Sequence, residues 1–174
     1  MNKMQEIRVE KVTLNIGTGG PGEKLDKATK LLQNLTGVKP VSTSTKKRIP
    51  TWGTRPGLKI GCKVTLRGEK ARNFLKRLIE AKGNRLKVSS FDQQGNVSFG
   101  IPEYLDIPGA EYDMSIGIIG LEAAVTLVRP GFRIARRRRL RKPIPKKAQI
   151  KKEEAMQFIS LTFGAKVGDD NDNE

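Results

Sequence analysis

The chemistry open to this sequence is limited by its side chains, since its 174 residues include one cysteine and no histidine. Without histidine, neither His-based general acid–base catalysis nor His metal ligation is available. Cys62 lies on the apolar side of a predicted strand with no histidine to activate it, so we interpret it as a packing residue. A single cysteine forms no internal disulfide and suits a reducing compartment. From the side chains alone we therefore expect no catalytic residue, metal or cofactor.

Positive charge is the property that distinguishes the chain. It has 34 Lys and Arg against 18 Asp and Glu, a formal net charge of +16. Such an excess on a small protein is typical of nucleic-acid binding, with a generally solvated basic surface as the alternative. Membrane binding is disfavoured, because no apolar run approaches the ~20 residues of a spanning helix. The first ten residues lack the apolar core of a signal peptide, so we expect a cytoplasmic protein.

The stretch from Pro40 to Gly68 has the pattern of a strand, a basic loop and a second strand. The strands are predicted at 41–45 and 60–67, and apolar and polar residues alternate strictly in the second. The loop combines positive charge, proline, glycine and the only tryptophan, with no acidic residue. We predict a basic finger that reads RNA, and its candidate contact residues are Lys46, Lys47, Arg48, Trp52 and Arg55.

The segment from Gly17 to Gly22 raises a different possibility, because it matches G-x-G-x-x-G after a strand and before a helix. Dinucleotide sites occur in this context. However, Glu23 would repel phosphate from the first turn of the helix, and no acidic residue stands ~20 positions further on to hold a ribose. We favour a strand-to-helix connection, and a nucleotide-binding protein using residues 17–22 is the alternative.

Hydrophobic periodicity predicts the elements that position these segments. We predict strands at 7–16 and 121–128, a hairpin over 85–101 and a strand at 112–116. Amphipathic helices are predicted from Leu25 to Leu35 and over 69–82, with a short helical turn at 102–106. Short antiparallel strands with helices of this kind predict an α+β fold, an antiparallel sheet with helices packed on one face.

The two faces of that sheet differ in chemistry. One face collects Val12, Leu14, Ile16, Cys62, Val64 and Leu66, which the apolar stripes of the helices would cover. The opposite face presents hydroxyl, amide and cationic groups, which bond phosphates, 2′-hydroxyls and base edges. The predicted RNA contacts of this face are Lys11, Thr13, Asn15, Lys63, Thr65 and Arg67, with Ser42 and Ser44 of the neighbouring strand. A plain solvated face is the alternative, since polar outer faces are common on antiparallel sheets.

The segment from Arg129 to Lys152 has twelve basic residues and no acidic one, including the run Arg136, Arg137, Arg138 and Arg139. Its prolines exclude a continuous helix. We predict an extended basic arm that orders on RNA, with a disordered tail as the alternative. The predicted organisation is one RNA-binding domain over 1–167, including this arm at 129–152 and a helix at 153–163, followed by an acidic disordered tail at 168–174.

Four motifs in order resemble one known family. They are VEKVTLNIGTG, LTGVKPVSTSTKK, GLKIGCKVTLRGEKARNFL and FDQQGNVSFGIPEY, within residues 6 to 128. Together they resemble the L-five family of large-subunit ribosomal proteins, the partner of 5S ribosomal RNA. The basic segment after Arg129 looks more like the archaeal than the bacterial form.

The resemblance implies a structural ribosomal protein in the central protuberance of the large subunit, and not an enzyme. It implies 5S rRNA binding by the polar sheet face, around Asn15 and Thr65, and contact of the 46–58 loop with P-site tRNA. It also implies a bridge to a small-subunit head protein. Whether the arm lies on 5S or on the larger rRNA stays open.

Overall fold

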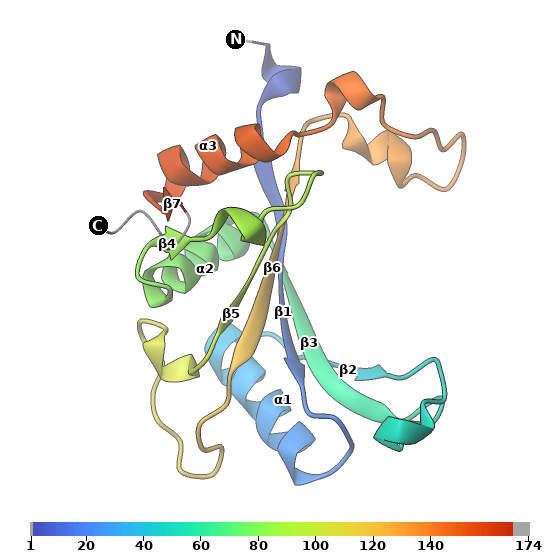
Figure 1. The fold of residues 1–174 in the computed structure, drawn as a ribbon, viewed down its shortest axis with the longest axis vertical. Coiled ribbons are helices and arrows are strands. Elements are labelled where there is room, and N and C mark those ends of the chain that lie inside the picture. Colours follow the sequence, from blue (N-terminus) through green and yellow to red (C-terminus); the bar gives the residue numbers. More distant parts are fainter. Residues whose placement is uncertain (1, 169–174) are drawn as a thin grey trace. The chain divides into compact units, whose positions relative to one another are not determined.

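A computed structural model describes residues 2–168 of the chain (Figure 1). They form two compact units. The first unit contains residues 2–12, 67–99 and 124–168, and the second contains 13–66 and 100–123. The predicted acidic tail lies outside the described residues except for Gly168. The prediction of a single RNA-binding domain over 1–167 stays a prediction.

Five strands form one antiparallel sheet in the order β2-β3-β1-β6-β5, and three α-helices accompany it, so the predicted α+β class is confirmed (Figure 1). The strands are β1 (Arg8–Gly17), β2 (Val41–Ser44), β3 (Lys59–Arg67), β5 (Val97–Ile101) and β6 (Leu121–Val128). The helices are α1 (Glu23–Thr36), α2 (Gly68–Ala81) and α3 (Lys152–Phe163). Short 3-10 turns are η1 (Lys3–Gln5), η2 (Pro50–Trp52), η3 (Val88–Ser90), η4 (Tyr104–Asp106), η5 (Phe132–Ala135) and η6 (Lys146–Ala148). Within residues 2–168, no helix is long and apolar enough to cross a lipid bilayer.

In the second unit, helix α1 covers the apolar face of β3. The buried residues of α1 follow helical spacing and are Leu25, Ala28, Leu31 and Leu32. The Cys62 side chain of β3 is buried, and burial raises the pKa of the thiol. Cys62 is thus a packing residue, as predicted. The helix ends at Gly37, whose φ of 65° is left-handed and whose N–H donates to the Gln33 carbonyl.

The first unit has its own core. Helix α2 buries Ala71, Phe74, Leu75, Leu78 and Ile79 along one stripe, as the sequence pattern predicts. Helix α3 buries Ala155 and Ile159 and begins one residue before its predicted start. Its first turn is capped by Glu154, whose carboxylate accepts the N–H of Lys151 at 2.9 Å.

Alternation in β3 follows the prediction, since Cys62, Val64 and Leu66 are buried while the residues between them are exposed. In β1 the alternation holds from Val12 to Ile16 but is interrupted further back. Val9 and Val12 are both buried, with Glu10 and Lys11 between them. The alternation of buried and polar residues is therefore interrupted by one extra residue, so that the polar Glu10 and Lys11 are consecutive in β1.

Two predicted elements are wrong. Residues 112–116 form a turn rather than a strand, because the Asp113 carboxylate accepts the N–H of Ser115 at 2.8 Å and closes the chain locally. The first half of the predicted 85–101 hairpin is also not paired with β5. Instead β4 (Arg85–Leu86) pairs in parallel with β7 (Lys166–Val167). The second half of the predicted hairpin forms as β5, and its tip closes through the bridge between Phe91 and Val97. Two-residue strands are too short to show a period in the sequence.

Candidate nucleic-acid interface

In the second unit, the face of β3 opposite α1 is polar. Lys63 and Thr65 are exposed there, and Thr13 and Asn15 of β1 are partly exposed. The Asn15 side-chain nitrogen donates to a carboxylate oxygen of Glu122 in β6 at 3.1 Å. This contact fixes the amide and leaves its carbonyl oxygen as an acceptor for a hydroxyl or amino group. The arrangement offers hydroxyl, amide and ammonium groups to a ligand without an aromatic platform.

In the first unit, an acidic residue organises the basic ones. The Glu10 carboxylate, whose side chain is only 12% exposed, pairs with Arg67 at 3.3 Å and with Arg136 of the arm. Its second oxygen is buried without a hydrogen-bond partner among the described residues. Glu10 thus holds two predicted RNA contacts in fixed positions while neutralising part of their charge. Lys11 lies beside it in β1 and is partly exposed.

Ser42 and Ser44 of β2 differ in how they pair with β3. In the β2–β3 register Val41 lies opposite Lys63, and Ser42 lies opposite Cys62. Directly opposed residues share a face, so Ser42 belongs to the face of Cys62 and not to that of Lys63. The register shifts between Thr43 and Ser44, which places Ser44 opposite Lys59. The alternation of a single strand could not reveal this shift.

The predicted finger is a folded loop in the second unit. At its base the N–H of Thr45 donates to the Leu58 carbonyl at 2.9 Å, and the Thr45 hydroxyl bonds to the carbonyl of Arg55. At its tip Ile49 and Thr54 form an antiparallel bridge, and Thr54 is buried. These bonds give the loop a defined backbone.

The side chains of the finger point outward. Lys46, Lys47, Arg48 and Arg55 are exposed, and the Trp52 side chain is 72% exposed in the η2 turn. An exposed tryptophan among cations has a ring face free to stack on a base and charges nearby for phosphates. The structure therefore brings the five predicted finger contacts together on one loop.

The glycine loop at 17–22 has a structural explanation. The N–H groups of Thr18 and Gly19 both donate to the carbonyl of Ile60, at 2.9 and 3.2 Å. These are donors that a phosphate-binding loop would direct at its ligand. Gly22 precedes α1 with a φ of 121°, a conformation that favours glycine, and the first turn of α1 carries Glu23 and Asp26. The loop connects β1 to α1 and has the wrong charge for an anion site.

The arm at 129–152 is anchored at several points in the first unit. Arg129 pairs with Glu154 of α3 at 2.8 Å and donates to the Ala148 carbonyl, and the N–H of Lys142 donates to the Ile134 carbonyl at 3.3 Å. Arg136 pairs with Glu10, and Arg137 donates to the carbonyl of Leu140 at 2.9 Å. Arg138 and Arg139 are exposed, and residues 2–168 give them no hydrogen bond or ion pair.

Sequence reasoning missed the acidic residues that order the interface, Glu10 and Glu122. The available signal was a carboxylate within a strand, since Glu122 lies between Leu121 and Ala123 and Glu10 lies between Val9 and Lys11. Their partners, however, are 57 and 107 residues away along the chain. Pairings at such separations depend on strand order, which the pattern of one strand does not contain.

Comparisons with known proteins give consistent matches along the chain. A family model described as Ribosomal protein L5 matches residues 2–55, and a second model, for the C-terminus of the same ribosomal family, matches residues 59–158. The large ribosomal subunit protein uL5 of Sulfurisphaera tokodaii is 55% identical over 168 residues, covering 96% of this chain and 95% of that protein. The uL5 protein of Nanoarchaeum equitans is 53% identical over 165 residues, covering 94% and 97%. That of Sulfolobus acidocaldarius is 49% identical over 166 residues, covering 95% and 93%.

Proposed function

Because the chain belongs to the ribosomal protein L5 family, and so is a structural constituent of the large ribosomal subunit and not an enzyme, we propose that it binds 5S rRNA through its polar sheet residues. The observation that carries the proposal is the chemistry of these residues. Opposite the buried face of β3, Lys63 and Thr65 offer an ammonium and a hydroxyl group to solvent. Structured RNA is recognised through such contacts to phosphates and 2′-hydroxyls.

Each unit offers its own polar groups to RNA. In the second unit Asn15, fixed by Glu122, supplies an oriented amide. In the first unit Arg67 is held by Glu10 and keeps most of its side chain exposed. An arginine has five donors, so one that pairs with a carboxylate retains others for a phosphate. These groups position an RNA backbone without requiring a particular sequence.

A charge-reversing substitution in the second unit tests the platform. Thr65→Asp places a carboxylate where a phosphate is expected, and affinity for 5S rRNA should fall at least about tenfold. The matched control is Thr162→Asp on the exposed surface of α3, which should bind like the wild type. Equal affinity of all three proteins for 5S rRNA in a filter-binding titration would show that Thr65 is not part of the interface.

Salt dependence tests the electrostatic part. If the protein neutralises several phosphates, the logarithm of its association constant should fall steeply and linearly with the logarithm of salt concentration. Binding that does not change with salt would contradict this part of the proposal.

We further propose that the 46–58 loop contacts P-site tRNA from a position in the central protuberance. Its exposed Trp52 and cations support this, because they suit an RNA that arrives and leaves. Deleting residues 48–57 should preserve 5S rRNA binding and weaken tRNA in the P site of reassembled ribosomes. Loss of 5S rRNA binding by a correctly folded deletion variant would show that the loop contacts 5S rRNA instead of tRNA.

The arm and the remaining partners complete the proposal. The exposed Arg138 and Arg139, beside the anchored Arg136 and Arg137, are suited to rRNA phosphates of 5S or of the larger RNA. A bridge to a small-subunit head protein follows from the family alone. Crosslinking in joined ribosomal subunits tests the bridge, and a crosslink to a protein of the small-subunit head is the expected result.

A further inference from the structure

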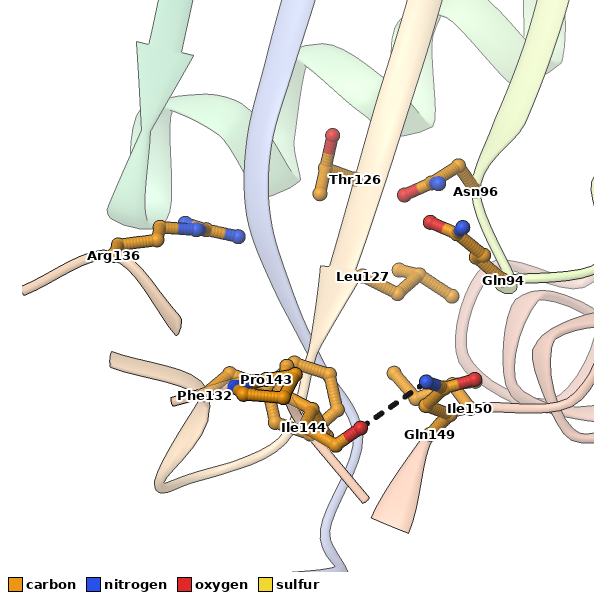
Figure 2. A pocket seen from close by; sticks show the side chains of 10 residues that line it. All are labelled: Gln94, Asn96, Thr126, Leu127, Phe132, Arg136, Pro143, Ile144, Gln149 and Ile150. Carbon is orange, nitrogen blue, oxygen red and sulfur yellow. Dashed lines mark hydrogen bonds between the residues drawn. The ribbon is translucent and has the colours of Figure 1, made fainter. Parts of the chain in front are cut away.

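A pocket of about 360 Å³ lies in the first unit where the arm meets the end of β6 (Figure 2). Phe132, Arg136 and Ile144 of the arm line it, together with Thr126 of β6 and Asn96 of the turn before β5. Figure 2 shows the Asn96 side chain approaching from one side of β6 and Arg136 from the other. A pocket of this size lies at the lower end of the range for small-ligand sites, about 300–1,000 Å³.

The turn that forms one wall is held by Asp92. One carboxylate oxygen accepts the backbone N–H groups of Gln94 and Asn96, at 2.9 and 2.6 Å, and the other accepts the Asn96 side-chain nitrogen at 2.7 Å. The nitrogen of the Asn96 amide is therefore occupied. The described residues give its carbonyl oxygen no donor, so that oxygen remains an acceptor at the pocket.

The turn also fits closely against the end of the arm. Gly95 has a φ of 76°, and a Cβ atom there would lie 2.7 Å from the side chain of Ile150. On the arm, the Gln149 side-chain nitrogen donates to the carbonyl of Ile144 at 3.2 Å. Both walls are thus fixed by short-range contacts before any ligand arrives, which reduces the entropy cost of binding.

The lining combines two kinds of surface. Phe132 and Ile144 provide an aromatic face and an aliphatic one, against which a flat ring can pack. Asn96 and Thr126 provide a carbonyl acceptor and a hydroxyl group at the rim, and Arg136 provides a cation. A site for free phosphate would not require the apolar part, and a site for an aliphatic chain would not require the acceptor.

We propose that this pocket receives one unstacked base of ribosomal RNA, whose backbone is held by the arginines of the arm. The inference rests on the proposed function and adds a subsite to it. The carbonyl of Asn96 accepts from an exocyclic amino group, which adenine, cytosine and guanine carry, so these bases are preferred over uracil. Unpaired bases in RNA loops and bulges are recognised by this combination of stacking and edge contacts.

Chemical probing of rRNA tests the inference. Large subunits are reconstituted with and without the full-length protein and treated with dimethyl sulfate and with kethoxal, which together modify unpaired adenine, cytosine and guanine. An adenine, cytosine or guanine that becomes protected only when the protein is present is expected. It should be the base crosslinked by a photoreactive phenylalanine analogue at position 132, whereas the same analogue at the exposed Tyr112 should not crosslink to it.

A pocket-filling variant provides the second measurement. Ile144→Trp should occupy the space of the base and weaken rRNA binding by about five- to a hundredfold, the range for one base–aromatic contact. Ile144→Leu keeps the volume and should bind like the wild type. Unchanged binding by a folded Ile144→Trp variant, or crosslinks from position 132 only to paired nucleotides or to protein, would overturn the inference. Failure of the wild type to bind rRNA at all would instead contradict the proposed function.

Discussion

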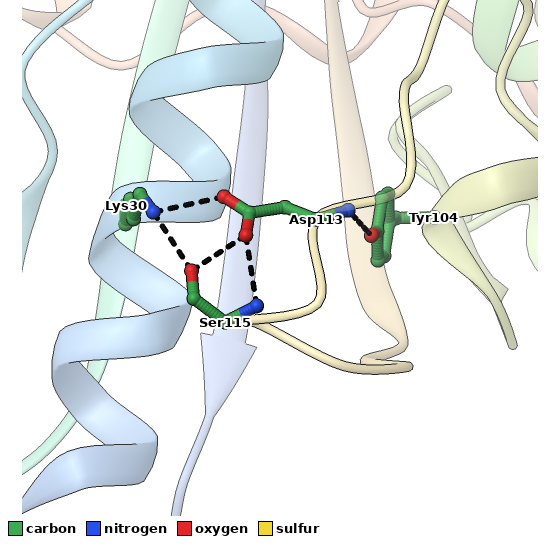
Figure 3. Close-up of polar contacts among 4 residues, drawn as sticks. All are labelled: Lys30, Tyr104, Asp113 and Ser115. Atoms are coloured by element: carbon green, nitrogen blue, oxygen red, sulfur yellow. Dashed lines mark hydrogen bonds and ion pairs between the residues drawn. The ribbon is translucent and has the colours of Figure 1, made fainter.

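The Lys30 ammonium lies 2.8 Å from a carboxylate oxygen of Asp113, and it donates to the Ser115 hydroxyl at the same distance (Figure 3). The other Asp113 oxygen accepts the N–H and the hydroxyl of Ser115, at 2.8 and 2.6 Å. The backbone N–H of Asp113 donates to the hydroxyl of the buried Tyr104 at 3.2 Å. One aspartate therefore fastens a surface loop of the second unit to helix α1 and to the core.

This contact predicts a specific dependence of stability on pH. The hydrogen bond from Lys30, followed by those from Ser115, lowers the pKa of Asp113 to about 2, from an ordinary value of 3.8. Because the folded pKa lies below the unfolded one, the contribution of Asp113 is complete above the unfolded pKa. It is lost as pH falls through the folded pKa. The Asp113→Asn variant should be less stable than wild type at pH 6, and the difference should shrink toward pH 2.

Urea unfolding of both proteins between pH 2 and pH 7 measures this difference. Asp106→Asn, at an exposed carboxylate of the same unit, is the matched control and should not show the same pH-dependent difference from wild type. A difference between wild type and Asp113→Asn that stays constant down to pH 2 would contradict the assignment.

The same loop shows where prediction from sequence succeeds and where it fails. Tyr112, Met114 and Ile116 alternate with polar residues and suggested a strand, yet Tyr112 and Met114 are exposed and only Ile116 is buried. The carboxylate of Asp113 closes a local turn through Ser115, and its ion pair with Lys30 holds this turn against α1. Alternation thus predicted a strand where an aspartate and a serine two residues apart form a turn.

Elements with a long, regular period were predicted well. Helix α2 and strand β6 match their predicted ranges within one residue, since each buries one complete stripe or alternate face. The polar side of β3 followed from the same alternation. Glu10 and Ser42 show what the alternation of one strand cannot predict. The role of Glu10 depends on arginines that are distant in sequence, and the face on which Ser42 lies depends on the register of β2 and β3.

Arg136 and Arg138 differ in their contacts, which leads to a second prediction. Arg136 pairs with Glu10, while residues 2–168 give Arg138 no partner. Arg136→Gln should therefore loosen the arm and speed amide hydrogen exchange in residues 132–142, whereas Arg138→Gln should not, although both variants remove one charge. The cost in global stability should be at most about 1 kcal/mol, because the Arg136 side chain is half exposed. Equal exchange rates in the two variants would show that Glu10 does not hold the arm.

The ion pair of Arg129 with Glu154 should contribute more. The Arg129 side chain is only 12% exposed, and its Nε atom is buried without a partner among the described residues. Glu154→Ala would remove the ion-pair partner of this guanidinium and the acceptor of the Lys151 N–H, a loss of about 1–3 kcal/mol. Glu153→Ala removes an exposed charge from the same turn and should cost much less. Chemical denaturation compares the two, and equal losses would assign the effect to the interaction of either carboxylate with the N-terminus of α3.

The Lys151 contact also gives Glu154 a pH dependence. The hydrogen bond from the Lys151 N–H, and after it the Arg129 guanidinium, lower the pKa of Glu154. Its contribution is therefore present above the unfolded pKa and is lost as pH falls through the folded pKa. The destabilisation caused by Glu154→Gln should become smaller in acid, and a destabilisation that grows below pH 4 would contradict the sign.

The last prediction concerns the tip of the finger. Gly53 has a φ of 62° at the end of the η2 turn, and its N–H donates to the carbonyl of Pro50 at 2.9 Å. A β-branched residue is strained in this left-handed conformation. Gly53→Val should open the bridge between Ile49 and Thr54 and speed amide exchange there, while unfolding of the whole chain changes little.

A matched glycine separates strain from size. Gly20 has room for a Cβ atom and no left-handed φ, so Gly20→Val should not alter exchange at the tip. If the shape of the tip serves tRNA binding, Gly53→Val should weaken the tRNA contact while its positive charges remain, and Gly20→Val should not. A Gly53→Val variant with an opened tip and normal tRNA binding would show that charge alone matters in the loop. The defined backbone from Ile49 to Thr54 favours the first outcome, because it fixes the direction in which Trp52 is presented.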